Sequence, residues 1–201
     1  TRVERINSDE EERLRMGYEI RTVLRYAQRS GRTLKRTARI EVSGETFGTL
    51  TYGQAANLWR INFGENRRKN KDQLGYLLDT ERGFWQRSQN EQEENDAADA
   101  DPMSNSVARV IPYVEDHRNC LIIDLSEELS NERMASFEAA FKKAIQVTFQ
   151  LEDQELASEP LPTKAERKRL LLYEASEGGA GVLRQLLDDS KALARVASKM
   201  L

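Results

Sequence analysis

The acidic stretch from Ser88 to Ser106 constrains the fold most, because it divides the chain into two parts that could each fold. It holds six acidic residues and no basic one, and its only apolar residues are three alanines, one methionine and one proline. Such a segment cannot bury enough apolar surface to offset the entropy of ordering it. We therefore predict a mobile acidic linker at 88–106, between a first part at 1–87 and a third part at 107–201.

Charge differs sharply among these three parts. Residues 1–87 carry a net charge of +6, the linker −6 and residues 107–201 −3, which leaves −3 for the 201 residues. A single cysteine and a single histidine exclude an intrachain disulfide and a zinc site built from cysteine and histidine alone. No apolar run is long enough to cross a membrane, so we expect no membrane partner and a cytoplasmic location. Because the chain begins with threonine, we expect it to be a piece of a longer protein or a trimmed form of one.

The first part is predicted to be a basic, mostly antiparallel β unit. Apolar and polar residues alternate from Tyr18 to Tyr26, which is typical of a strand, and Ser8 with Glu11 forms a capping box for a short helix up to about Met16. Further strands are predicted at 38–42 and 47–52, a strand or short helix at 56–61, and a hairpin from 74–78 to 84–85. Of its tryptophans, Trp59 and Trp85 are each expected in the core.

The third part is predicted to mix helices and strands. Strands are expected at 107–114, 119–125 and 170–174, with a hairpin turn at 115–118. A helix capped by Ser130 and a final helix at 191–201 are also expected. The fold class is therefore α+β: an antiparallel β N-terminal part and a mixed α/β C-terminal part that contains a strand, a glycine-rich turn and a helix.

The glycine-rich turn, which contains Gly178, Gly179 and Gly181, is the sharpest local motif. Glycines ahead of a helix can let a backbone approach phosphate, but no Lys-Ser/Thr pair follows, and Glu174 and Glu177 would repel an anion. We favour a structural turn that uses positive φ angles, and leave phosphate binding as the alternative.

Basic residues crowd 21–39 and 60–71 and suggest a nucleic-acid contact. Cations neutralise phosphates, and aromatic rings can stack on bases. A solvated charged surface is the alternative. The candidate nucleic-acid-binding residues are Arg21, Arg25, Trp59, Arg60, Arg67, Arg68, Lys69 and Lys71.

No catalytic or metal-binding set is predicted. Asp116 could orient His117 as a general base, but no nucleophile stands at a supporting spacing, so a surface histidine in a turn is the preferred interpretation. Cys120 begins an apolar strand and is expected to be buried and inert.

Several blocks of sequence resemble a known family. The stretch Leu170–Leu183 resembles the signature of the C-terminal domain attached to MrfA-type helicases, in a variant similar to DrmA-like helicases of the DISARM antiphage system. The other blocks that carry the resemblance are Ser8–Arg13, Gly17–Thr22, Leu58–Asn62, Arg67–Asn70, Asp79–Trp85 and Tyr113–Asn119.

The resemblance implies a superfamily-two DNA helicase or translocase, with ATP and Mg used by its motor in phage defence or DNA repair. This chain has neither the motor's Gly-Lys-Ser/Thr loop nor its Asp-Glu-Ala-Asp/His box, and it lacks the cysteine cluster that holds zinc in many members. We therefore expect no cofactor in this chain and leave open whether it is part of an enzyme. A cysteine cluster present in the parent would follow Leu201.

Three functions remain to be compared. The first is an accessory C-terminal domain that contacts DNA, either single-stranded or duplex with an overhang, beside the helicase motor of the same protein. The second is a protein-docking module that joins the motor to a companion defence subunit. The third, a free-standing nuclease, has only scattered acids to support it.

Overall fold

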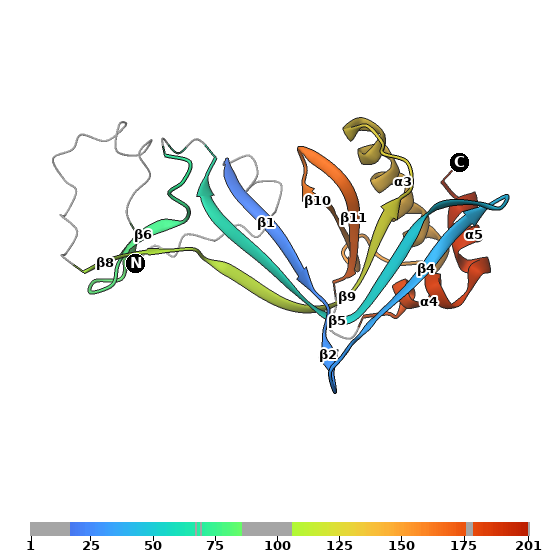
Figure 1. Cartoon of the computed structure of the whole chain (residues 1–201), viewed down its shortest axis with the longest axis horizontal. Helices are drawn as coiled ribbons and strands as arrows, with labels where there is room; N and C mark the ends of the chain where they lie inside the picture. Colours follow the sequence, from blue (N-terminus) through green and yellow to red (C-terminus); the bar gives the residue numbers. More distant parts are fainter. Residues whose placement is uncertain (1–16, 67, 69, 86–105, 176–178, 201) are drawn as a thin grey trace. The chain divides into compact units, whose positions relative to one another are not determined.

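The computed structural model describes residues 17–66, 68, 70–85, 106–175 and 179–200 (Figure 1). The chain forms two compact units, Thr1–Arg21 with Arg60–Val114, and Thr22–Trp59 with Glu115–Leu201. Each unit is discontinuous in sequence, because the chain crosses from one unit to the other within three strands. The predicted helix at 8–16 and the predicted linker at 88–106, apart from Ser106, lie outside the described residues.

The main sheet contains six strands. Its order is β1 (Tyr18–Arg25), β5 (Glu45–Glu65), β9 (Tyr113–Leu125), β11 (Glu166–Glu174) and β10 (Leu156–Thr163), with β4 (Lys35–Val42) also paired to β5. The pairs β4 with β5, β9 with β11 and β10 with β11 are all antiparallel. The α+β class is confirmed.

β5 is one strand of 21 residues, so the prediction of a separate element at 56–61 is wrong. Ala55 has a left-handed backbone with φ of 45°, which interrupts the alternation of faces. Tyr52 consequently packs in one core and Ala56 in the other, although strict alternation would put both on the same face. Because the alternation of buried and exposed residues is interrupted at Ala55, the sequence pattern indicated that one strand ended there and another element began.

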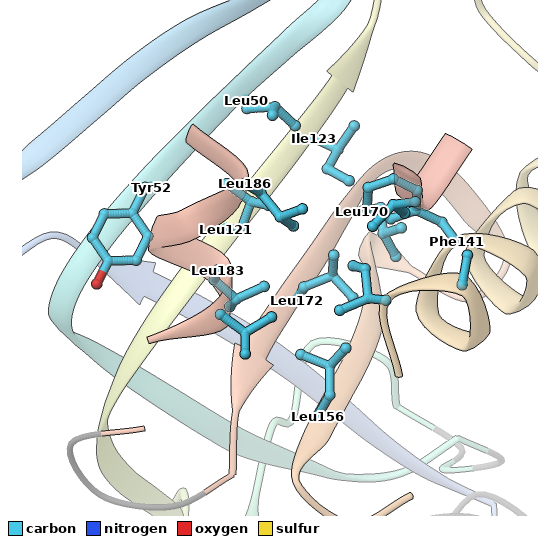
Figure 2. Packing of buried hydrophobic residues seen from close by; sticks show 14 of the residues in the cluster. Leu50, Tyr52, Leu121, Ile123, Phe141, Leu156, Leu170, Leu172, Leu183 and Leu186 are labelled. Atoms are coloured by element: carbon cyan, nitrogen blue, oxygen red, sulfur yellow. The ribbon is translucent and has the colours of Figure 1, made fainter. Parts of the chain in front are cut away.

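Hydrophobic clusters cover both faces of the sheet in the second unit. Leu121, Ile123, Leu170 and Leu172 point into the larger cluster (Figure 2), where α3 (Asn131–Phe149), α4 (Val182–Asp188) and α5 (Ser190–Ser198) pack. Ile122 and Leu171, which alternate with these residues, belong to the smaller cluster on the other face. Its buried members are Ala56, Leu58, Cys120, Ile122, Leu171 and Tyr173. Strands buried on both faces explain the short continuous apolar runs at 120–123 and 170–173.

The predicted helix after Ser130 is confirmed as α3. The Ser130 hydroxyl accepts a hydrogen bond from the backbone N–H of Arg133 at 3.3 Å. Met134, Phe141 and Ile145 are buried on one face of the helix, as their spacing predicted. No helix in the described part of the chain is long and apolar enough to cross a membrane.

Two small β elements complete the fold. β2 (Gln28–Arg29) and β3 (Arg32–Thr33) form a short hairpin, and β7 (Phe84–Trp85), β6 (Tyr76–Asp79) and β8 (Val107–Val110) form a three-stranded sheet. The predicted hairpin at 74–85 is confirmed, but Trp85 is 53% exposed, so its expected place in the core is wrong. The sheet has only two residues in β7, too few to bury a ring of that size.

The predicted turn at 115–118 is also wrong, because these residues lie inside β9. The preceding strand ends at Val110, before Pro112, whose missing N–H cannot extend a ladder. A run of charged residues is typical of a turn, which is why the segment was predicted as one. In the structure these residues occupy exposed and half-buried positions of β9.

Candidate nucleic-acid interface

The glycine-rich turn wraps around the buried carboxylate of Glu174. This side chain accepts a hydrogen bond from the backbone N–H of Leu183 at 3.1 Å and another from Asn119 Nδ2 at 3.1 Å. Gly179 has φ of 61°, and a Cβ placed there would lie 1.6 Å from Glu174 Oε2. The protein's own carboxylate therefore occupies the N-terminus of α4, where an external anion would otherwise bind.

This geometry favours a structural role for the turn. Gly181 has φ of 73° and serves as the N-cap of α4, a backbone conformation that glycine adopts without strain. Gly178 lies outside the described residues. Repulsion of a phosphate by Glu174 stays a prediction, and the hydrogen bonds that hold this carboxylate inside the turn were not foreseen from the sequence.

Within the basic loop at 65–71, Arg68 binds the protein itself. Its guanidinium donates to Glu19 Oε2 at 2.8 Å and to the backbone carbonyls of Glu65 and Lys71, and its side chain is only 14% exposed. The hydrogen bond from Arg68 is the main cause that lowers the pKa of Glu19 below its ordinary value. Arg68 thus holds the loop to β1.

The other candidates of this group differ in their surroundings. Lys71 donates from Nζ to the carbonyl of Asn66, and Arg21 shares the carboxylate of Glu19 at 2.5 Å while stacking 5.1 Å from the Phe63 ring centroid. Glu19 therefore brings Arg21 and Arg68 together. The remaining positions divide into the half-buried Trp59 and Arg60, the exposed Arg25, and Arg67 and Lys69, which lie outside the described residues.

Four cations outside this predicted set are exposed in the second unit. Residues 20–40 contain seven basic residues and no acidic one. Arg36 pairs with Asp188 at 2.5 Å, whereas no ion pair in the described part of the chain engages the other basic residues after Arg25. These are Arg29, Arg32, Lys35 and Arg39. The signal that could have selected them is the length of the acid-free run.

The lone histidine and cysteine do not form a reactive pair. His117 Nδ1 lies 2.8 Å from Asn57 Oδ1 on the exposed side of β9, and the thiol of Cys120 is buried. Burial raises the pKa of Cys120 to about 12, so this thiol is neutral at physiological pH. The expectation of a buried cysteine is confirmed, and its inertness stays a prediction.

Comparison with known proteins gives one family match. Residues 137–201 match the family model of the MrfA Zn-binding domain, MZB. This part of the chain is similar to the MZB domain. The matched region begins within α3, includes the glycine-rich turn, α4 and α5, and ends at residue 201. No curated protein matches the chain.

One solved structure also aligns with the chain. It is the crystal structure of the DUF1998 helicase MrfA bound to DNA, with 9% sequence identity and a TM-score of 0.45. The alignment covers 90% of this chain and 20% of that helicase, so the chain spans about a fifth of the helicase's length.

The expectation of no cofactor for this chain is wrong, because the matched MZB family is a zinc-binding domain. The residues of the chain nevertheless do not fit a zinc site of the usual composition. Across residues 17–66, 70–85, 106–175 and 179–200, no three His, Cys, Asp or Glu side chains gather closely enough to hold a metal ion. Cys120 lies in the smaller hydrophobic core, whereas His117 is exposed.

Proposed function

We propose that this chain is an accessory domain of an ATP-dependent DNA helicase or translocase that serves in bacterial phage defence, in a DISARM-like setting. In this proposal the chain holds the nucleic-acid backbone in the cytoplasm while a separate motor hydrolyses ATP with Mg. The observation that supports it most is the similarity of residues 137–201 to the MZB domain.

The distribution of charge supports the nucleic-acid part of the proposal. The chain as a whole is slightly acidic, yet its first 87 residues carry a net charge of +6. Clustered cations attract phosphate groups and release their counterions on binding, which makes affinity strongly dependent on salt. The expected ligand is DNA that is single-stranded or has a single-stranded overhang.

The loop at 65–71 supplies one group of proposed contacts. Because Arg68 is engaged with Glu19 and two backbone carbonyls, we assign it a supporting role. Arg67 and Lys69 flank it and are the proposed phosphate contacts of this loop.

Fluorescence anisotropy with labelled single-stranded and duplex oligonucleotides tests this assignment. The double variant Arg67→Glu and Lys69→Glu is expected to weaken binding at least tenfold at about 100 mM salt and to reduce the salt slope. The matched control is Lys164→Glu with Lys199→Glu, which makes the same charge change at exposed positions elsewhere. Equal affinities of the loop variant and the wild type would overturn the assignment of the loop.

Protein docking is a second candidate, favoured by exposed aromatic side chains. Phe84 and Trp85 on β7 are 63% and 53% exposed. Aromatic residues of this kind anchor protein interfaces. If Phe84 and Trp85 dock a partner, replacing both by serine would abolish capture of the helicase motor or a companion subunit in a pull-down. The affinity for DNA would stay unchanged. Unchanged capture would count against docking through β7.

A further inference from the structure

Two arginines face each other across the turn of the β2–β3 hairpin, which projects from the second unit (Figure 1). Arg29 and Arg32 are directly opposed in the register, and both are exposed. The turn between them, Ser30–Gly31, has φ of 50° and 74°, as the tight hairpin turn requires. Like charges at directly opposed positions destabilise a strand pair, so this arrangement has no benefit for folding.

The next two cations lie on one face of β4. Arg36 pairs with Asp188 of α4 and Ile40 packs against the larger core, which fixes the face that these residues share. Lys35 and Arg39 alternate with them and therefore lie on the opposite face. They are four positions apart, a separation of about 13 Å along a strand.

Small residues lie beside these two cations in the neighbouring strand. Lys35 is opposite Gly53 and Arg39 is opposite Thr49, while between them the hydroxyl oxygens of Thr37 and Thr51 are 3.4 Å apart. The side chains around Arg39 are thus short and carry hydroxyl groups, whereas the Tyr26 ring covers Gly53 beside Lys35. Lys35 and Arg39 are both exposed, so a long polyanion could reach the two cations from solvent.

We propose that Arg29, Arg32, Lys35 and Arg39 form a phosphate tract that binds the nucleic-acid backbone without stacking on the bases. The proposal rests on the nucleic-acid function proposed above and locates a second contact surface, separate in sequence from the loop at 65–71. None of the four cations takes part in an ion pair within the described residues, and no acidic residue lies between positions 20 and 40.

The neighbouring side chains favour this class of ligand. Tyr26 is half-buried, with the Lys35 Nζ atom 5.9 Å from its ring centroid, so it is not an exposed platform for a base. Apolar side chains that insert among the lipids strengthen binding to a membrane surface, whereas Thr33 and Thr37 accompany these cations. Backbone binding through cations alone predicts affinity that varies little with base sequence.

Neutralising the tract tests the proposal. The variant carries Arg29→Thr, Arg32→Thr, Lys35→Thr and Arg39→Thr, in which threonine keeps a high β propensity. Its affinity for labelled mixed-sequence single-stranded DNA would be measured by anisotropy between about 50 and 300 mM KCl, since removal of one phosphate-binding cation lowers the log–log salt slope by about 0.7. We expect a slope smaller by about 3 and an affinity at least tenfold weaker.

A matched variant controls for the change in net charge. It replaces four exposed lysines by glutamine: Lys143, Lys164, Lys191 and Lys199. The proposal requires the control to keep most of the wild-type slope, and thermal unfolding must show that both variants fold. Oligonucleotides of poly-dT and mixed sequence should show the same decrease in affinity.

The failures of the two proposals are distinguishable. If the wild-type chain does not bind DNA at 50 mM KCl, the proposed function fails, and the tract fails with it. If the wild type binds and the tract variant keeps its affinity and slope, only the tract is wrong. The tract variant could instead keep its DNA binding but no longer sediment with anionic phosphatidylserine vesicles, unlike the wild type. That result would assign the tract to a membrane surface and overturn the proposal.

Discussion

At the scale of single residues, Gly179 shows how a glycine can be required by one neighbouring atom. Its positive φ disfavours any side chain, and a Cβ there would collide with the carboxylate that caps α4. Gly181 has a similar φ, but a Cβ there would meet no atom within 4 Å. A substitution at Gly181 would therefore cause backbone strain alone, whereas one at Gly179 would cause both strain and a steric collision.

We expect Gly179→Ala to lower the free energy of unfolding by about 2–4 kcal/mol, since it adds the loss of the Glu174 hydrogen bonds to backbone strain. Gly181→Ala should lower it by about 1 kcal/mol, from strain alone. Urea denaturation of both variants measures the difference. A Gly179→Ala protein of normal stability that no longer binds DNA would instead make the turn a ligand site.

Cys120 predicts how stability depends on alkaline pH. Burial raises the pKa of its thiol to about 12, against about 8.5 in an unfolded chain. Above pH 8.5 the unfolded state loses this proton while the folded state keeps it, so the free energy of unfolding should fall by about 2 kcal/mol between pH 8 and pH 10. Urea denaturation at each pH measures this, and Cys120→Ala should remove most of the slope. An equal slope in that variant would contradict this assignment.

At the scale of elements, the loop at 65–71 is held to β1 by Arg68. The ion pair with Glu19 is partly buried, with side-chain exposures of 14% and 22%. Because Arg68 holds the pKa of Glu19 low, the contribution of the pair is present at neutral pH and decreases as acid protonates Glu19.

Arg68→Met should therefore lower the free energy of unfolding by about 1–2 kcal/mol at pH 7, and by less at pH 4. Direct effects on DNA affinity should be small, because this guanidinium already has protein partners. Denaturation followed by circular dichroism at the two pH values measures the free energy of unfolding, and fluorescence anisotropy measures the affinity for DNA. A stable Arg68→Met protein with strongly reduced affinity would make Arg68 a phosphate contact after all.

Most of the helices and strands could be predicted from the spacing of apolar residues in the sequence. Alternation identifies β1, and helical spacing with Ser130 identifies α3, because burial and capping select those residue types. β5 could not be predicted as one strand, since the left-handed Ala55 reverses its alternation. The segment at 115–118 could not be recognised as strand, since its charges lie on a long strand at positions typical of a turn.

The candidate site was predictable only in part, for a related reason. Sequence identifies where cations are dense but not which of them meet an acid from elsewhere in the chain. Arg68 is engaged by Glu19, 49 positions away, and Arg36 by Asp188, whereas Arg29 and Arg32 meet no acid partner in the described part of the chain. The fold thus leaves exposed cations, Arg29 and Arg32 among them, that lie outside the densest basic cluster of the sequence.

At the scale of the whole chain, charge and topology divide the molecule differently. Net positive charge belongs to residues 1–87, yet the compact units mix residues from both ends, because β5 and β9 continue through both. Basic residues of the N-terminal part thereby share a unit with the helices of the region similar to MZB. The division into three parts at 88–106 stays a prediction.

The central claim is that this chain binds the nucleic-acid backbone, and the most direct test is its affinity for unmodified DNA as a function of salt. Anisotropy of labelled single-stranded, overhang and duplex DNA would be followed from about 50 to 300 mM KCl. We predict binding whose logarithm falls linearly with the logarithm of salt concentration, with a slope of several units and little dependence on base sequence. Absence of binding to all three ligands at 50 mM KCl would contradict the account.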